Sequence, residues 1–244
     1  AYGGDRLGMY YVEKGASQRP SKVIYDRKYS SISTAKREDF DWDAIFEGAQ
    51  WFHFTGITPA LSDGCVDICR DALKAAKAKE LTISCDLNYR KNLWSSEKAG
   101  KVMAELMGDV DLCIANEEDA EKVFGIKADD TDISGGRLSR EGYINVARQL
   151  TDRFGFKMVA ITLRGSISAS DNDWGAMLYV DGQSYFSRNY RIHIVDRVGG
   201  GDSFVGALIF ALLSDYDTQR AVEFAAAASC LKHTIEFDFN QVTV

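Results

Sequence analysis

Proline, histidine and long apolar runs are scarce in this chain of 244 residues, which has 2 prolines and 3 histidines. No run approaches the 18 or so apolar residues that would span a bilayer, and the first residues lack the basic-then-apolar order of a secretory signal. The formal net charge of −7 argues against a general surface for nucleic acid or anionic membranes, because clustered Lys and Arg hold phosphate groups. We therefore expect a cytoplasmic protein that binds neither nucleic acid nor membrane, and any anionic ligand must meet a locally positive pocket.

The cysteines and histidines lack the spacing of a metal site or a catalytic triad. None of the 5 cysteines forms a CxxC pair. Cys65 and Cys69 share a helix face, where a metal site is possible, but no second pair completes a tetrahedral set. Reduced core thiols are the favoured interpretation. His53, His193 and His233 stand apart from one another and from any suitable Ser or Cys, which favours structural roles.

From residue 51 onward, short apolar runs alternate with segments of helical period, the pattern of crossover units that build a parallel sheet. The expected strands cover 51–56, 81–88, 111–116 and 157–163. The expected helices cover 60–79, 96–107, 117–124, 141–154, 202–213 and 218–231, with a polar loop over 127–140. Asp181 and Gly182 between two alternating runs predict a tight hairpin. The predicted fold class is α/β, with a mostly parallel sheet flanked by helices.

The first 35 residues have a different character. Aromatic and β-branched runs over 8–13, 22–27 and 30–33 have no helix of sufficient length between them, which predicts strands of a small separate sheet. We therefore predict a small β lid over 1–35 and an α/β body over 36–244.

Three successive glycines, Gly199, Gly200 and Gly201, stand directly before Asp202 and an apolar helical run. Their backbone N–H groups can converge without Cβ obstruction, and the helix behind them adds its positive end, so this segment can cradle an anion. A carboxylate beside bound phosphates is electrostatically adverse unless it has a task, and accepting a proton from an attacking hydroxyl is such a task. The alternative is that Asp202 is only a helix N-cap.

The run D-R-V-G-G-G-D-S-F over 196–204 resembles the C-terminal signature of the PfkB family of carbohydrate kinases, which have the ribokinase-like fold. The resemblance implies that Asp202 is the catalytic base and that the amides of Gly199, Gly200 and Gly201 form an anion hole for the γ-phosphate of ATP. Arg197 stands where Thr or Pro is commoner in the family, and Gly200 where Ala is usual. Neither change removes a required donor.

Two further motifs resemble this family. Asn116 and Asp119 are similar to its N-x-x-E motif, which organises Mg²⁺, and the shorter Asp119 would act through water; a capped, acidic helix start is the alternative. The run T-L-R-G-S, with Gly175 after a polar insertion, resembles the T-L-G-x-x-G nucleotide loop. It implies that four residues line the nucleotide: Thr162, Arg164, Gly165 and Ser166.

Two arginines that converge on a substrate suit a carboxylate better than a neutral sugar, because a guanidinium supplies paired donors. The runs G-M-Y-Y-V-E, V-I-Y-D-R and D-L-N-Y-R resemble the 2-keto-3-deoxygluconate kinases of the family, which phosphorylate the terminal primary hydroxyl of an acid sugar. The resemblance implies substrate contacts from Tyr10, Tyr25, Arg27, Arg90, Asp202 and Asp238, and a place for Asn88 near the nucleotide phosphates. Phe237 stands where the family prefers a small residue. Taken singly, an exposed Tyr or Arg is more often a solvated surface residue.

Other interpretations remain open. The chain could be a fructokinase or ribokinase of the same family that acts on a neutral sugar, or a non-catalytic sugar or nucleotide sensor, against which Asp202 and the three glycines argue. A nicotinamide-dependent oxidoreductase fits less well, because the glycines fall late in the chain and no acidic strand end follows them.

Two expectations concern the whole protein. The family's opening strand and helix, and its terminal helix, have no counterpart in the sequence, so we expect a longer chain. We also expect a homo-oligomer that pairs through the lid, where Tyr11 and Ile24 form apolar faces.

Overall fold

The computed structural model describes residues 3–127 and 140–243, so the loop expected over 127–140 lies almost entirely outside the described residues. The chain forms two compact units. Unit 1 contains the described parts of Ala1–Tyr11, Ile24–Lys127 and Gln149–Met158. Unit 2 contains those of Val12–Val23, Ala128–Arg148 and Val159–Val244.

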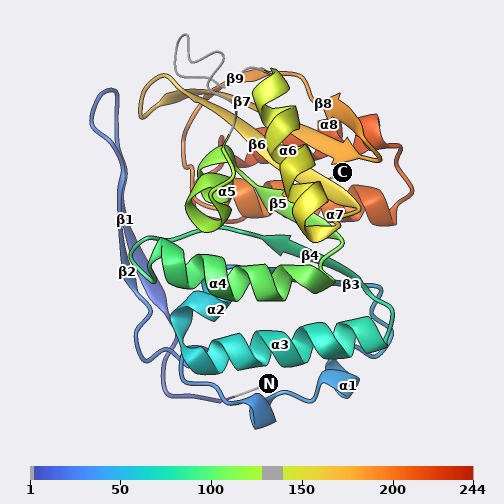
Figure 1. Cartoon of the computed structure of the whole chain (residues 1–244). Helices are drawn as coiled ribbons and strands as arrows, with labels where there is room; N and C mark the ends of the chain where they lie inside the picture. The colour runs from blue at the N-terminus through green and yellow to red at the C-terminus, as the bar shows by residue number, and fades with distance from the viewer. Residues whose placement is uncertain (1–2, 128–139, 244) are drawn as a thin grey trace. The chain divides into compact units, whose positions relative to one another are not determined.

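Unit 1 is built on a parallel sheet. Its strands β3 (Trp51–Thr55), β4 (Thr82–Asp86) and β5 (Leu112–Ala115) pair side by side, with Cys85 opposite Cys113. All four residues of β5 are buried, as expected for a parallel strand that is covered on both faces. The helices α3 (Asp63–Ala78) and α4 (Ser96–Leu106) lie next to each other, and α5 (Glu117–Phe124) contacts α4 (Figure 1).

The structure divides the long helix expected over 60–79 into two helices. A short α2 (Ile57–Leu61) ends at Ser62, and α3 begins at Asp63. Ser62 has an extended backbone, and its hydroxyl accepts a hydrogen bond from the N–H of Cys65 at 3.2 Å, so it is the N-cap of α3. The apolar face of α3 buries Cys65, Cys69 and their helical neighbours in the core.

Unit 2 contains antiparallel pairs and two packed helices. Strand β7 (Asp171–Val180) pairs with β8 (Gln183–Phe186) and with β9 (Tyr190–His193), and β6 (Met158–Ser166) neighbours β7. The predicted hairpin is confirmed, since Asp181 and Gly182 have φ of 50° and 78° between β7 and β8. The helices α7 (Gly200–Leu213) and α8 (Thr218–Lys232) pack together, and α6 (Arg140–Phe154) straddles the boundary of the units in sequence.

The small sheet predicted near the start of the chain consists of β1 (Met9–Glu13) and β2 (Lys22–Asp26). The prediction of a third strand over 30–33 is wrong. The carbonyl of Ser30 accepts hydrogen bonds from the Thr34 N–H at 3.1 Å and the Ser33 hydroxyl at 2.8 Å, so the segment folds into turns. Serine side chains compete in this way with strand formation.

Sequence periodicity missed four short elements: η1 (Arg37–Asp39), α1 (Trp42–Ile45), η2 (Met107–Asp109) and β9. The α/β class, with a mostly parallel sheet, flanking helices and a separate small sheet, is confirmed. None of the helices in the described ranges has the length and apolar character that a bilayer span requires.

Candidate active site

The glycine turn, residues 199–201, forms the start of α7 in unit 2. Gly199 is the N-cap with φ of 79°, and the helix begins at Gly200. A Cβ built on Gly199 would lie 1.7 Å from the carbonyl oxygen of Asp238, so only glycine fits both the conformation and the space. The interpretation of Asp202 as the N-cap is therefore wrong, because Asp202 lies three residues beyond that position.

Two of the three glycine amides are available to a ligand. The N–H of Gly200 donates to the Arg197 carbonyl at 3.3 Å. In the part of the chain that the structure describes, the N–H groups of Gly199 and Gly201 have no protein acceptor. Asp202 is exposed in the first turn, and within the same described ranges its carboxylate makes no hydrogen bond or ion pair. The arrangement offers anion-binding donors and a free carboxylate base at one helix start.

His233 explains why glycine stands at position 200, where the family usually has alanine. A Cβ on Gly200 would lie 2.4 Å from Cε1 of the His233 ring. The ring is 3% exposed; its Nδ1 lies 2.7 Å from the Ser229 carbonyl, and its centroid lies 4.8 Å from that of Trp174. Burial lowers the pKa of His233. The expected structural role of this histidine is confirmed, but its contact with the glycine turn was not predicted.

Thr162, Arg164, Gly165 and Ser166, the expected nucleotide-loop residues, lie within strand β6, which continues to Ser166. The connection to β7 is therefore only 167–170, shorter than the predicted loop. Arg164 is exposed. Burial is the main reason that the pKa of the His233 imidazole is lowered, and the charges of Lys232, Arg164 and Arg197 lower it further. Contact of these four residues with a nucleotide stays a prediction.

The segment after α8 also reaches the turn. Asp238 places its carbonyl against Gly199, while its side chain is exposed. Phe237 has φ of 69° and is 67% exposed, so a bulky residue occupies a left-handed conformation that favours glycine. This conformation gives a physical reason for the small residue that the family prefers at this place.

In unit 1, four predicted site residues gather beyond the carboxyl ends of β4 and β5. Asn116 is the N-cap of α5, and its side-chain oxygen accepts the Asp119 N–H at 2.7 Å. Asp119 Oδ1 accepts the N–H of Tyr89 at 3.1 Å, between Asn88 and Arg90. Burial raises the pKa of Asp119 to about 6, an effect that its bond to Tyr89 and the charge of Arg90 partly offset.

These contacts bear on the metal hypothesis. The capped helix start is present, and Asp119 also ties the β4 exit to α5. Over residues 3–127 and 140–243, no three His, Cys, Asp or Glu side chains are placed to hold a metal together. The oxygen donors of Asn116 and Asp119 nevertheless have the chemistry that Mg²⁺ prefers, and a nearby cation would stabilise the buried carboxylate.

The lid residues of unit 1 form a second cluster. The rings of Tyr10 and Tyr25 lie 6.4 Å apart, and the Arg27 guanidinium lies 4.4 Å from the centre of the Tyr25 ring. Arg27 Nη1 is buried and has no hydrogen-bond partner among the described residues. A buried donor without an acceptor costs free energy, so this site is suited to an anionic ligand.

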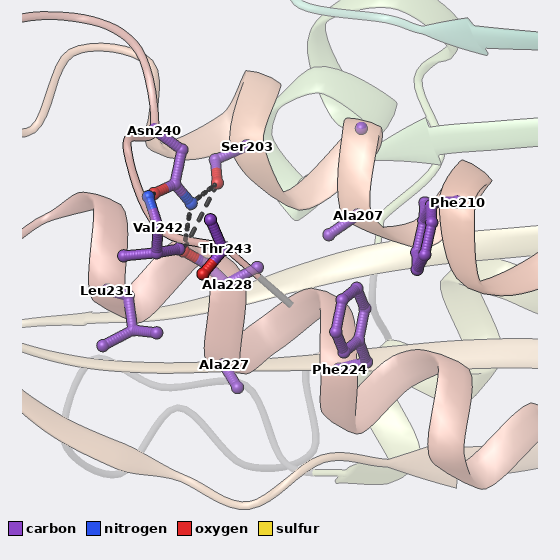
Figure 2. A pocket seen from close by; sticks show the side chains of 11 residues that line it. Ser203, Ala207, Phe210, Phe224, Ala227, Ala228, Leu231, Asn240, Val242 and Thr243 are labelled. Atoms are coloured by element: carbon purple, nitrogen blue, oxygen red, sulfur yellow. Dashed lines mark hydrogen bonds between the residues drawn. The ribbon is translucent and has the colours of Figure 1, made fainter.

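A groove of about 340 Å³ runs between α7 and α8 in unit 2 (Figure 2). Ser203 and Asn240 join at one end through a hydrogen bond of 2.9 Å, and Phe210 faces Phe224 at the other, with centroids 5.7 Å apart. Its lining is largely alanine, phenylalanine, leucine and valine, without a titratable side chain.

Comparison with known proteins agrees with these features. A sequence profile of the pfkB family of carbohydrate kinases matches residues 2–234. The crystal structure of 2-dehydro-3-deoxygluconokinase from Thermotoga maritima superposes with a TM-score of 0.91 at 58% identity, over 97% of this chain and 70% of that one. A 2-dehydro-3-deoxygalactonokinase of Haloferax volcanii is 33% identical over 238 residues, 98% of this chain and 68% of that protein. A 2-dehydro-3-deoxygluconokinase of Thermoproteus tenax is 27% identical over 93% of this chain, which spans 62% of its length.

Proposed function

Because the chain belongs to the pfkB family of carbohydrate kinases, we propose that it transfers the γ-phosphate of ATP to the terminal primary hydroxyl of 2-keto-3-deoxygluconate. This acid sugar is the 2-dehydro-3-deoxygluconate in the name of the 58% identical Thermotoga protein. The chain spans between 62% and 70% of the lengths of the relatives described above, so the activity proposed is that of the whole protein.

The buried, unpartnered Nη1 of Arg27 is the observation that supports an acid sugar. A carboxylate would supply the acceptor that this guanidinium lacks, and the Tyr10 and Tyr25 rings would pack beside the sugar carbons. Arg90 supplies a second positive charge from the β4 exit. Neutral sugars offer only hydroxyls, which compensate a buried guanidinium less well than a carboxylate does.

Asp202 is the proposed general base. It would take the proton of the terminal hydroxyl as that oxygen attacks the γ-phosphate in line. The N–H groups of Gly199 and Gly201 would donate hydrogen bonds to the negatively charged oxygens of the transferring group. The carboxylate and the terminal hydroxyl lie at opposite ends of the six-carbon substrate. Binding energy at the carboxylate therefore orients the hydroxyl rather than reacting with it.

Mg²⁺ is the proposed metal. Asn116 and Asp119 would hold it through its water ligands, and the ion would neutralise charge on the ATP phosphates. Asn88, Thr162, Arg164, Gly165 and Ser166 are the proposed nucleotide contacts, and Asp238 is the proposed contact that closes over the sugar.

A second substrate has support of its own. The Haloferax relative is named for 2-keto-3-deoxygalactonate, which differs from the gluconate in the configuration at one carbon. Both sugars carry the same carboxylate and the same terminal hydroxyl, so Arg27 and Asp202 would serve either.

The test of the substrate is ADP release over a panel of acid sugars, fructose and ribose. Arg27→Ala and Arg90→Ala should each lower kcat/KM on the acid sugars roughly 10- to 150-fold, which corresponds to the free energy of a hydrogen bond between charged groups. Both variants should lower kcat/KM on fructose far less. Arg19→Ala is the matched control, because this lid arginine is 56% exposed and pairs with Glu13 at 2.8 Å. Equal losses on acid and neutral sugars would remove the main support for an acid substrate.

The test of the base is Asp202→Asn. This variant should bind ATP normally and lose about two to four orders of magnitude in turnover. A loss below tenfold at saturating substrates would exclude Asp202 as the base. Binding of sugar or nucleotide by the wild-type protein without any ADP release would favour the non-catalytic sensor.

A further inference from the structure

Lys232, the last residue of α8, is completely buried, with 0% exposure, although it carries a charged side chain. Lysine is rarely buried in full, because removing an ammonium group from water is costly unless its donors are satisfied. A lysine at a helix end could have reached solvent at little cost. Its burial therefore needs a structural or functional reason.

The Lys232 ammonium group binds two backbone carbonyls that belong to different segments. Nζ donates to the carbonyl of Asp196 at 3.3 Å and to that of Ile235 at 3.3 Å. The Asp196 segment leads directly into the glycine turn. The Ile235 segment leads to Asp238, whose carbonyl lies against Gly199. One buried cation thus joins both segments that enclose the turn.

Among the described residues, no carboxylate forms an ion pair with Lys232, so these two carbonyls are the acceptors of its ammonium group. Burial lowers the pKa of Lys232, the charges of Asp196 and Asp238 partly offset this effect, and the charge of Lys14 adds to it. The Asp196 carboxylate is occupied elsewhere, by Lys14 Nζ at 3.4 Å and by the N–H of Val198 at 3.2 Å.

Neutral hydrogen bonds complete the attachment of the turn to α8. The His233 carbonyl accepts the N–H groups of Val195 at 2.8 Å and Asp196 at 3.2 Å. The Ser229 hydroxyl donates to the Gly200 carbonyl at 2.7 Å. The end of α8 therefore fixes the peptide groups that precede and begin α7, and Lys232 is the one member of this set that acts through a charge.

We propose that Lys232 is a positioning residue for phosphoryl transfer, whose buried ammonium group holds the glycine turn so that the amides of Gly199 and Gly201 remain free for a phosphoryl oxygen. The inference rests on the proposed kinase activity. Lys232 does not touch the reacting atoms; it acts through the Asp196 and Ile235 carbonyls. A purely stabilising lysine would affect the unfolding temperature alone, whereas a positioning lysine affects the turn and kcat in the folded protein.

The experiment compares Lys232→Met, which keeps most of the side-chain length without the charge, with Lys232→Ala. The control is Lys157→Met, at a lysine whose side chain is 76% exposed. The first readout is the amide spectrum of protein labelled with ¹⁵N-glycine. We expect the Gly199, Gly200 and Gly201 signals to shift in Lys232→Met, while those of Gly108 and Gly155, in unit 1, stay in place. The control should shift none of these signals.

The second readout is turnover below the melting temperature of each variant. Lys232→Met should lower kcat about 10- to 100-fold, the scale of a small misplacement, and leave KM for the sugar within threefold. Added propylammonium should restore part of kcat in Lys232→Ala, where it can fill the space of the lost side chain, and none in Lys232→Met.

Unchanged glycine signals together with kcat within twofold of wild type would overturn the inference and leave Lys232 a stabilising residue. If Lys232→Met does not fold, the deciding experiment is the addition of propylammonium to Lys232→Ala. Recovery of the fold without recovery of the native glycine signals would also overturn the inference. If the wild-type protein phosphorylates no sugar, the proposed function fails, while the glycine signals still judge whether Lys232 holds the turn.

Discussion

The effects of substitutions at Gly200 and His233 on the unfolding free energy should be coupled. The perturbation is Gly200→Ala, which places a Cβ 2.4 Å from Cε1 and 2.7 Å from Nε2 of the His233 ring. Carbon atoms in contact are normally about 3.5 to 4.0 Å apart, so the ring or the turn must move by about 1 Å. The ring cannot retreat easily, because it is bonded to the Ser229 carbonyl and packs against Trp174.

The expected magnitude follows from these contacts. Overpacking of this kind costs about 1–3 kcal/mol of unfolding free energy, and replacing glycine by alanine in a helix returns up to about 1 kcal/mol. Gly200→Ala should therefore destabilise the protein when His233 is present. In a His233→Ala background the obstruction is gone, and the same change should be neutral or stabilising. The coupling between the two substitutions should be about 1–3 kcal/mol.

Urea unfolding of the wild type, both single variants and the double variant measures this coupling. Gly201→Ala is the matched control, since a Cβ there meets nothing within 4 Å and the conformation is helical. It should be neutral or stabilising. Additive effects of Gly200→Ala and His233→Ala, or a stabilised Gly200→Ala with His233 intact, would refute the steric explanation of this glycine.

Four further outcomes are expected. Burial lowers the pKa of His53 to about 4, so the folded state binds this proton less tightly than the unfolded state does. The unfolding free energy should therefore fall by at most about 3 kcal/mol as the pH drops from 6.5 towards 4. The unfolding free energy of His53→Gln should depend less on pH over this range, and identical pH profiles for the two proteins would contradict the assignment. Asp119→Asn should raise the Mg²⁺ concentration for half-maximal rate about 10- to 100-fold, and an unchanged requirement would separate Asp119 from the metal. The protein should sediment as a homodimer at micromolar concentration. The substitution Ile24→Glu, at a lid residue that is 55% exposed, should shift the equilibrium towards monomers. A monomeric wild-type protein would exclude pairing through the lid. Phe237→Gly should raise the unfolding free energy by up to about 1 kcal/mol, because the left-handed conformation disfavours a side chain; Phe239→Gly, without a positive φ, should not, and equal effects would show that strain is unimportant.

The features that sequence analysis predicted well depend on local information. Short apolar runs predicted the core strands, and the pair of Asp181 and Gly182 predicted the hairpin. Both succeed because strand burial and turn conformation depend on only a few neighbouring residues. The glycine turn before α7 was predicted for the same reason. Asp202 was assigned two roles from sequence, and only the observed helix start could exclude the N-cap.

The errors and omissions have other physical causes. The run over 30–33 has strand-like composition, but its serines bond the local backbone instead. Ser62 interrupts an apolar helical pattern that continues on both sides of it. The contact between Gly200 and His233 joins positions 33 residues apart, and no periodicity signals it. Lys232 looks like an ordinary basic residue at a helix end, so only its observed burial distinguishes it.

The five free cysteines are all buried, so their rates of alkylation can report how often the core opens. Burial raises the pKa of Cys69 and of Cys230 to about 12, so thiolates are rare in the native state and alkylating reagents must wait until the core is exposed. Cys230 lies in unit 2, and the other four lie in unit 1. Mass spectrometry of the alkylated positions over time would therefore report how often each unit opens, without any engineered label.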